Sequence, residues 1–454
     1  MRWFGPPVGI VRVEREFAKW AIKHDQNCQF VFFNPILQIY QEVRQQHLST
    51  LLEGQITVDT TGMPNASGSR RRKTDRVPRA ILPAFLWLTQ FRRMALRTAG
   101  VSLLANKSAR LRHINYIIQR ILAGGKYRRL LISSDGQQRA VVPVEALVGA
   151  PVVFQPGDRV LFTGANWEHS NVAVLCKQKQ RVDLDFISLC HDVIPLKFPH
   201  FFAPRDVTSL RRHFDQVFEI ASLNLVCSNV VANDISQYCS ANGIEVGPIR
   251  KIPLGFNFSG DFDTPALHAV LPHSSSCVLF VSTIEPRKGH ELAKRVWSRL
   301  VQEGIPQKLN VVLVLVGRAG WMVGDLIKSL RSHQHIAVLD DSDDEELAGL
   351  YNQAQFCIYP SQYEGYGLPV IEALARGKPI LASNVGIVPE LRSRLLRRLP
   401  PNDEESWYTA MKEWLTNSKA RPQISDKDTT DFRHPTWEEA AAQAFTTIYD
   451  DIRL

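Results

Sequence analysis

The sequence predicts an α/β protein with two doubly wound parallel sheets. Short apolar runs alternate with helical patterns in two blocks, and a polar stretch from Ile252 to Ser276 separates the blocks. Strands that are buried on both faces read as continuous apolar runs, and their alternation with helices is typical of parallel sheets. In addition, the apolar run 356–360 leads through a glycine-containing loop to Pro369, where a helix is expected to begin. Proline suits the first helical position because its φ is already helical and its missing N–H is not needed there.

The elements follow in order along the chain. The first block predicts a helix from Val230 to Tyr238 and strands at 159–164, 184–190 and 223–228. The second block predicts helices between strands at 277–282, 311–316, 335–339, 356–359 and 379–383. Because doubly wound sheets bind ligands beyond the carboxyl ends of their strands, we expect functional residues in the loops that follow them.

These blocks define the predicted domains. We expect a Rossmann-like N-terminal domain over residues 1–260, a Rossmann-like C-terminal domain over 261–433 and a closing C-terminal helix over 434–454. A turn-rich segment that starts at Gly54 opens a basic insertion at about 54–130 within the first domain. A chain of 454 residues is long enough for two or three domains.

Composition limits the class of protein. Hydrophobic residues make up 44% and charged residues 22% of the chain, as in ordinary globular proteins. The seven cysteines are scattered without a C-x-x-C pair, which favours reduced thiols over disulfides or a metal cluster. The N-terminal residues show no signal peptide, and no apolar stretch is long enough to span a bilayer. We therefore expect a cytoplasmic protein that needs no metal, and peripheral attachment to the inner face of the plasma membrane is the alternative location.

The net charge of +9 is concentrated between Arg70 and Arg129, where Asp75 is the only acidic residue. If residues 83–100 are helical, they place arginines beside an apolar side, an arrangement that suits an anionic membrane surface. A solvated face over an ordinary core helix explains the same pattern equally well. No nucleic-acid-binding motif accompanies the charge, so a nucleic-acid partner is not expected.

The most informative segment runs from Ser361 to Gly377 and contains two carboxylates near a predicted helix start. Glu364 lies in the loop after a strand, and Glu372 lies about one turn into the helix. The N-terminus of a helix offers unpaired N–H groups and a positive dipole end, which favour a phosphate. Carboxylates beside a phosphate site can bind hydroxyl groups, so the segment indicates a nucleotide-sugar site.

The predicted strand 277–282 is followed by two adjacent cations, Arg287 and Lys288. Fixed cations can offset the charge that develops on a diphosphate leaving group, and arginine can pair with two phosphate oxygens. Taken alone, such a pair is usually a surface turn. The acidic run 340–346 could bind a cation, but an acid-rich helix N-terminus explains it better.

Together these motifs resemble a known family. The seven residues between Glu364 and Glu372 match the E-x7-E signature of the large retaining glycosyltransferase family 4, which includes many mannosyltransferases of surface-polysaccharide assembly. The remaining likeness lies in the phosphate-binding segment 283–289, the His-Asp-x-x-Pro turn at 191–195 and the N-terminal glycine loop at 9–13. The resemblance covers most of the chain and is strongest from about 157 to 390.

The resemblance implies the GT-B fold, in which two Rossmann-like domains face a cleft. The nucleotide sugar would bind mainly to the C-terminal domain and the acceptor to the N-terminal one. Glu372 would then hold the ribose, and Glu364 would contact hydroxyls of the donor sugar. Backbone N–H groups would help to hold the diphosphate, and these belong to Gly365, Tyr366, Gly367 and Leu368.

The same resemblance assigns further roles around the donor. Arg287 and Lys288 would hold the diphosphate, and His191 would lie beside the transferred sugar. Asp192 and Gly9 would complete the donor-binding residues, although Asp192 could also simply cap a turn. The anomeric configuration would be retained without a side-chain nucleophile.

The function implied is transfer of a sugar, with GDP-mannose as the preferred donor, to a lipid-diphosphate-linked glycan such as an intermediate of lipopolysaccharide biosynthesis. A dTDP-rhamnose or UDP-sugar donor is the alternative within the class, and a non-catalytic GT-B binding subunit is the competing class. Three departures from the family pattern favour the non-catalytic class. Ser282 stands where relatives often have arginine, Val11 replaces a second loop glycine, and the chain starts almost at that loop.

Overall fold

The computed structural model describes residues 9–34, 37–53, 56–59, 140–164, 167, 171–257, 276–340, 342, 344–422 and 432–451, together with positions 91, 94, 95, 98, 114 and 117–119. The basic region 70–129, with its predicted helix 83–100, therefore lies almost entirely outside the described residues. The chain divides into two compact units, Met1–Ser188 and Leu189–Leu454.

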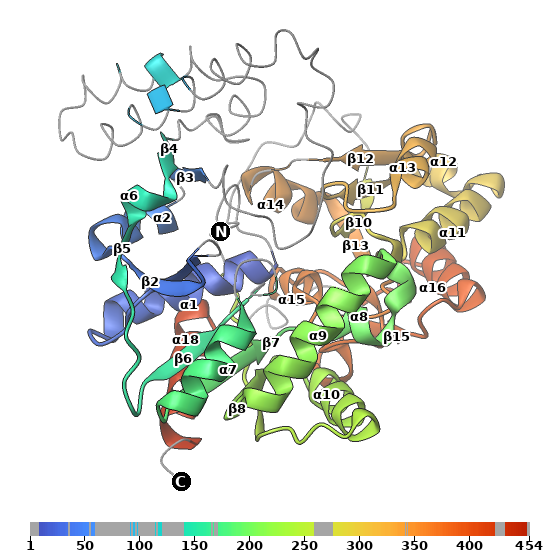
Figure 1. Ribbon diagram of the computed structural model, residues 1–454. Helices are drawn as coiled ribbons and strands as arrows, with labels where there is room; N and C mark the ends of the chain where they lie inside the picture. Colours follow the sequence, from blue (N-terminus) through green and yellow to red (C-terminus); the bar gives the residue numbers. More distant parts are fainter. Residues whose placement is uncertain are drawn as a thin grey trace, which may run out of the picture. The chain divides into compact units, whose positions relative to one another are not determined.

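The second unit contains a six-stranded sheet in the order β12-β11-β10-β13-β14-β15, and all neighbouring strands in it are parallel (Figure 1). Starting from β10, this is the spatial order 3-2-1-4-5-6 of a doubly wound Rossmann sheet. The order reverses between β10 and β13, so the loops after these two strands diverge at the point where such sheets bind ligands. The strands are β10 (Ser276–Val281), β11 (Val311–Val316), β12 (Ile336–Leu339), β13 (Ala354–Tyr359), β14 (Ile380–Ser383) and β15 (Leu396–Leu399).

Helices connect these strands and cover them. Figure 1 shows the strands between α11 on one side and α14 on the other, as double winding requires. The helices are η5 (Pro286–Lys288), α11 (His290–Gln302), α12 (Ile305–Leu309), α13 (Gly324–Arg331), α14 (Asp344–Gln353), α15 (Leu368–Ala375), η6 (Val388–Glu390) and α16 (Glu404–Thr416). The apolar strand sequences explain the burial, since Leu313, Val314 and Leu315 of β11 are fully inaccessible to solvent.

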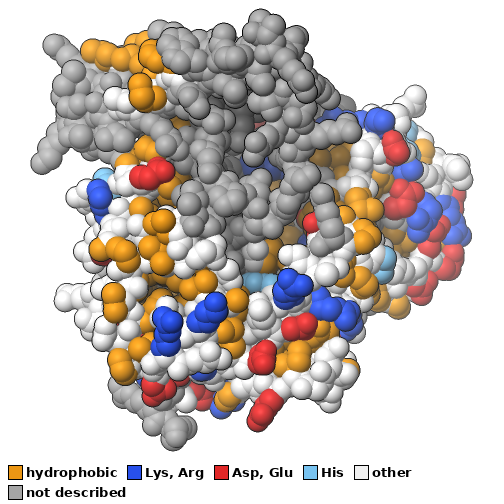
Figure 2. Space-filling view, viewed as in Figure 1, with side chains coloured by type: hydrophobic (Ala, Val, Ile, Leu, Met, Phe, Trp, Pro, Cys, Tyr) orange, Lys and Arg blue, Asp and Glu red, His pale blue; other side chains and the backbone are white. Residues whose placement is uncertain are grey.

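The outer face of α11 and α16 is highly charged. In Figure 2 the surface over these helices carries basic and acidic side chains beside one another. Arg295 pairs with Glu404 at 2.7 Å, and Arg299 pairs with Glu405 at 2.6 Å. Exposed pairs of this kind each contribute at most about 1 kcal/mol, so the buried apolar side of the helices holds them in place.

A smaller sheet has the order β6-β7-β8-β9, and the boundary between the two units falls within β7. The pairs β6–β7 and β8–β9 are parallel. The strands are β6 (Arg159–Phe162), β7 (Asp185–Cys190), β8 (Leu223–Val226) and β9 (Ile249–Lys251). The associated helices are α7 (Val172–Arg181), α8 (Ile194–Lys197), η4 (Pro199–Phe201), α9 (Pro204–Ile220), α10 (Asn229–Asn242) and the C-terminal α18 (Trp437–Asp451).

The first unit contains elements that the sequence did not predict. Its α1 (Ile10–His24) begins directly after Gly9, and an antiparallel sheet has the order β1-β2-β5. The other elements are β1 (Val31–Asn34), β2 (Ile39–Val43), η1 (Gln45–His47), α2 (Leu48–Leu52), the parallel pair β3 (Ile56–Asp59) and β4 (Ala140–Pro143), α6 (Val144–Leu147) and β5 (Val148–Pro151). None of these strands was identified from the sequence, although residues 30–33 form an apolar run.

The predicted α/β class with doubly wound, Rossmann-like sheets is confirmed. Each predicted strand of both blocks is present with ends that differ by at most two residues, and the closing helix forms from Trp437. One detail was wrong: α15 begins at Leu368, so Pro369 occupies the second helical position. Within the described part of the chain, no helix is long and apolar enough to cross a membrane.

Candidate functional site

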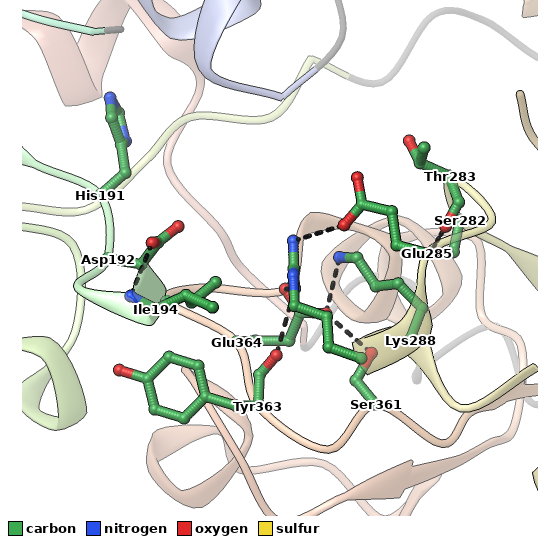
Figure 3. Close-up of polar contacts among 12 residues, drawn as sticks. His191, Asp192, Ile194, Ser282, Thr283, Glu285, Lys288, Ser361, Tyr363 and Glu364 are labelled. Carbon is green, nitrogen blue, oxygen red and sulfur yellow. Dashed lines mark hydrogen bonds and ion pairs between the residues drawn. The ribbon is translucent and has the colours of Figure 1, made fainter. Parts of the chain in front are cut away.

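The loops after β10 and β13 bring Glu364 against two cations (Figure 3). The Lys288 ammonium lies 2.6 Å from Glu364 Oε1, and Arg287 Nη1 lies 3.0 Å from Glu364 Oε2. The hydroxyl of Ser361 also donates to Oε1, at 2.7 Å. Glu364 is only 5% exposed, so its charge is neutralised inside the protein and not by water. The sequence predicted that these three ionic residues share a site, and the structure brings them together.

The surroundings keep Glu364 ionised. Burial raises the pKa of this carboxyl, but the charges of Arg287 and Lys288 outweigh burial and lower it to about 2. Burial and the nearby Arg287 lower the pKa of the Lys288 ammonium. The two cations are therefore close enough to repel each other, and Glu364 is the anion that holds them together.

A second carboxylate, Glu285, also contacts the arginine, and sequence reasoning missed it. Its Oε2 lies 3.1 Å from Arg287 Nη2, and both side chains are largely buried. Burial is the largest influence on Glu285 and raises its pKa, although Arg287 and Lys288 act in the opposite direction. An acidic residue two positions before a predicted phosphate-binding arginine was the signal that could have identified it.

The backbone between Glu364 and α15 offers free donors. Gly367, with φ 110°, precedes the first turn of the helix. Among the described residues, no acceptor is found for the N–H groups of Gly365, Tyr366, Gly367 and Leu368. A helix N-terminus with unpaired N–H groups attracts anions. These are the donors that the sequence assigned to a diphosphate.

The turn after β7 crosses this loop at very short range. A Cβ added to Gly365 would lie 1.9 Å from the carbonyl oxygen of His191. The hydroxyl of Ser228 donates to the Gly365 carbonyl oxygen at 2.6 Å, and Asp192 Oδ1 accepts from the Ile194 N–H at 3.1 Å. The structure thus brings the predicted residues His191 and Asp192 to the loop that carries Glu364, with Asp192 also capping its own turn. The ring of His191 lies apart from the ion-pair cluster in Figure 3.

Tyr363 anchors the loop from its other side. Its backbone oxygen accepts from Arg287 Nη1 at 3.1 Å, and its hydroxyl donates to Asp234 of α10. Its ring packs against Phe198 at a centroid distance of 5.1 Å. The position of the guanidinium is therefore fixed by a loop that is itself tied to a different sheet.

Glu372 is held by other residues. It lies one turn into α15, and its Oε2 accepts a hydrogen bond from the Tyr351 hydroxyl at 3.4 Å. Gly9 belongs to the other unit, so its predicted part in donor binding stays a prediction. The described residues contain no group of three His, Cys, Asp or Glu side chains placed to hold a metal ion.

The fold and this cluster define a Rossmann-type domain with a buried ion-pair cluster at the carboxyl ends of two neighbouring strands. Residues 268–430 match the model of the family described as Glycosyl transferases group 1. The chain therefore contains a glycosyltransferase group 1 domain, and all of the ionic residues above except Asp192 and Asp234 lie within it.

The relatives include O-antigen mannosyltransferases. The serotype-specific mannosyltransferase WbdA of Escherichia coli is 27% identical over 255 residues, which are 50% of this chain and 29% of that protein. O-antigen chain mannosyltransferase B of Escherichia coli is 29% identical over 168 residues, which are 36% of this chain and 43% of the relative. The match thus spans less than half the length of these curated relatives. Among solved structures, WaaG, a glycosyltransferase involved in lipopolysaccharide biosynthesis, aligns with 64% of this chain and 85% of its own at 14% identity and a TM-score of 0.48.

Proposed function

We propose that this protein is a retaining glycosyltransferase that moves a sugar from a nucleotide diphosphate to a glycan acceptor. The observation that carries the proposal is the pair Arg287 and Lys288, held by Glu364 beside the unpaired N–H groups at the start of α15. This pair lies within the glycosyltransferase group 1 domain. Fixed cations and N–H groups of this kind match the diphosphate of a nucleotide sugar in charge and in hydrogen-bonding type.

The chemistry follows from where charge develops. When the bond between the sugar and the diphosphate breaks, negative charge grows on the leaving phosphate oxygens. Arg287 and Lys288 are charged and oriented before the ligand arrives, so they can stabilise that charge without reorganising. The reaction then requires no metal, and Glu364 and His191 are the residues we place nearest to the sugar.

The donor, acceptor and location are finer parts of the proposal. The mannosyltransferase relatives support GDP-mannose as the donor and a lipid-diphosphate-linked glycan as the acceptor. The scattered cysteines, which include no C-x-x-C pair, favour reduced thiols and therefore support a cytoplasmic setting. In this proposal the basic region 70–129 holds the protein at an anionic membrane surface.

The direct test is transfer. Purified protein is incubated with radiolabelled GDP-mannose, UDP-glucose or dTDP-rhamnose and with a membrane lipid extract as the acceptor. We expect label to move into the lipid fraction from one donor, and GDP-mannose is the one we favour. A folded protein that binds a nucleotide without transfer or hydrolysis would instead support the non-catalytic binding subunit. Failure to bind or turn over any of the three would contradict the proposal.

The two carboxylates of the E-x7-E segment are predicted to differ in their roles. Glu372→Gln should weaken GDP binding, because it alters the carboxylate that we assign to the ribose. Glu364→Gln should mainly slow transfer and weaken GDP binding less than Glu372→Gln does, because Arg287 and Lys288 remain while the group that we place beside the sugar is lost. Isothermal titration gives the GDP affinity and single-turnover assays give the transfer rate. An equal loss of GDP affinity in both variants would refute this division.

A further inference from the structure

Arg287 contacts acceptor groups of the protein itself through both of its terminal nitrogens. Glu285 forms an ion pair with its Nη2. Its Nη1 forms an ion pair with Glu364 and donates a hydrogen bond to the Tyr363 carbonyl oxygen. A diphosphate that pairs with this guanidinium therefore has to replace one of these partners. Starting from the proposed function, we propose that Glu285 is a positioning residue that holds Arg287 until the donor diphosphate replaces it, and that it takes up a proton in the exchange.

The geometry identifies Glu285 as the partner that is replaced. Its Oε2 lies 3.1 Å from Arg287 Nη2, yet within the described residues this oxygen has no hydrogen bond, and neither has Arg287 Nε. The contact is thus an ion pair without hydrogen-bond alignment. On the Nη1 side the Glu364 contact is also an ion pair only, but the Tyr363 carbonyl oxygen accepts a hydrogen bond at 3.1 Å, and Lys288 and Ser361 hold Glu364 through its Oε1. Replacing Glu285 sacrifices no hydrogen bond, and an incoming phosphate can also satisfy the free Nε donor.

The loop that carries Glu285 is held in place by its backbone. The Ile284 N–H donates to the Arg318 carbonyl oxygen at 2.9 Å, and the Gly320 N–H donates to the Ile284 carbonyl oxygen at 2.8 Å. Both bonds tie this loop to the loop after β11. Figure 3 shows the carboxylates of Glu285 and Glu364 and the ammonium of Lys288 directed toward a common centre. The carboxylate of Glu285 therefore stays close to any anion that Arg287 binds.

The charges of the cluster explain why Glu285 should take up a proton when the diphosphate binds. Two cations, Arg287 and Lys288, face two carboxylates, Glu285 and Glu364, so the cluster is neutral without a ligand, and Asp192 adds a further nearby negative charge. A nucleotide-sugar diphosphate brings two more negative charges and removes Arg287 from Glu285. Burial already raises the pKa of Glu285, and both changes raise it further. A proton on Glu285 relieves the repulsion between this carboxyl and the diphosphate.

GDP-mannose is titrated calorimetrically into the full chain in PIPES and in Tris at the same pH. The difference between the binding enthalpies in the two buffers gives the number of protons that the protein takes up. GDP-mannose is the probe because both of its phosphates are esterified, whereas the terminal phosphate of GDP itself titrates near about pH 6. For the unmodified protein we expect net proton uptake and a Kd that rises with pH, with a limiting slope of about tenfold per pH unit for one proton. Glu285→Gln should abolish the uptake, flatten the pH dependence and bind GDP-mannose more tightly than the unmodified protein wherever the latter weakens with rising pH.

Glu291→Gln is the matched control, because Glu291 is half exposed at the start of α11 and pairs only weakly with Lys294, at 3.6 Å. It should behave as the unmodified protein does. Binding of GDP-mannose without proton uptake, or an unchanged pH dependence in Glu285→Gln, would overturn the role of Glu285 and leave the proposed function standing. If Glu285→Gln does not fold, the proton count of the unmodified protein still decides. Absence of binding by GDP-mannose, UDP-glucose and dTDP-rhamnose would overturn the proposed function and this inference with it.

Discussion

Replacing Glu364 by glutamine is expected to lower the free energy of unfolding by about 3–5 kcal/mol. Glu364 is the anion between Arg287 and Lys288, and its neutral replacement leaves both cations buried, with Glu285 as the remaining carboxylate in contact with the arginine. Breaking one side of a buried ion pair costs far more than removing a surface pair, because the remaining charge has no water around it. Urea unfolding followed by circular dichroism measures the loss.

The stabilisation of the fold by the Glu364 carboxylate should depend on pH. The pKa of Glu364 falls from an ordinary value of 4.5 to about 2 in the folded protein. A depressed carboxyl pKa stabilises the fold above the unfolded-state value, and this stabilisation is lost as the pH falls through the folded-state value. The difference in stability between the unmodified protein and Glu364→Gln should therefore be complete above about pH 5 and shrink as the pH falls toward 2.

Glu404→Gln serves as the control for this prediction. Glu404 is 41% exposed and pairs with Arg295 on the surface, so its replacement should cost at most about 1 kcal/mol. If Glu364→Gln were no more destabilising than Glu404→Gln, the buried ion-pair cluster would not be a stabilising unit of the fold.

Gly365→Ala is expected to destabilise the protein by about 3 kcal/mol or more, beyond the usual range for an added methyl group. Its Cβ would lie 1.9 Å from the His191 carbonyl oxygen and 2.9 Å from the Asp192 Cβ. The first of these is a backbone atom and cannot rotate away. The turn after β7 and the loop after β13 would have to separate, which would also break the hydrogen bond from Ser228 to Gly365. Thermal unfolding of the variant measures the cost.

Gly324→Ala is the matched control because its added Cβ would meet no atom within 4 Å at the first residue of α13. Alanine is a better helix former than glycine, so this change should be neutral or slightly stabilising. We also expect Gly365→Ala, but not Gly324→Ala, to lose nucleotide binding, since the displaced loop carries the free N–H groups. A Gly365→Ala variant with unchanged Tm would show that the crossing of the two loops tolerates expansion.

Much of the fold could be predicted from local patterns. The run Val311–Val316 is apolar at every position, and such a run has few stable alternatives to a strand buried on both faces. Apolar runs identified most strands of the two parallel sheets, but the short β9 and the strand β15, with two central arginines, were missed. In the first unit, β1 and β2 are short strands that pair antiparallel, and apolar periodicity over so few residues gives no clear signal.

The grouping of the residues at the candidate site could also be predicted from the sequence, but their contacts could not. Arg287, Lys288 and Glu364 are separated by 76 or 77 residues, but each follows directly after a predicted strand, and parallel strands end at one edge of their sheet. The position of these residues along the chain was therefore sufficient to bring them together. Their individual contacts were not predictable, because a position after a strand does not specify the direction of a side chain.

The sequence by itself determined the α/β class, most strands of the two parallel sheets and the identity of the charged residues at their carboxyl ends, because these depend on local hydrophobicity and on residue type. Only the tertiary structure decided how the charges are paired. It placed Glu285 on the second nitrogen of Arg287, tied Tyr363 to Asp234, and packed Gly365 against the backbone of His191. The latter two contacts join residues more than 100 positions apart, and such contacts depend on how the loops of two sheets pack and not on any local pattern.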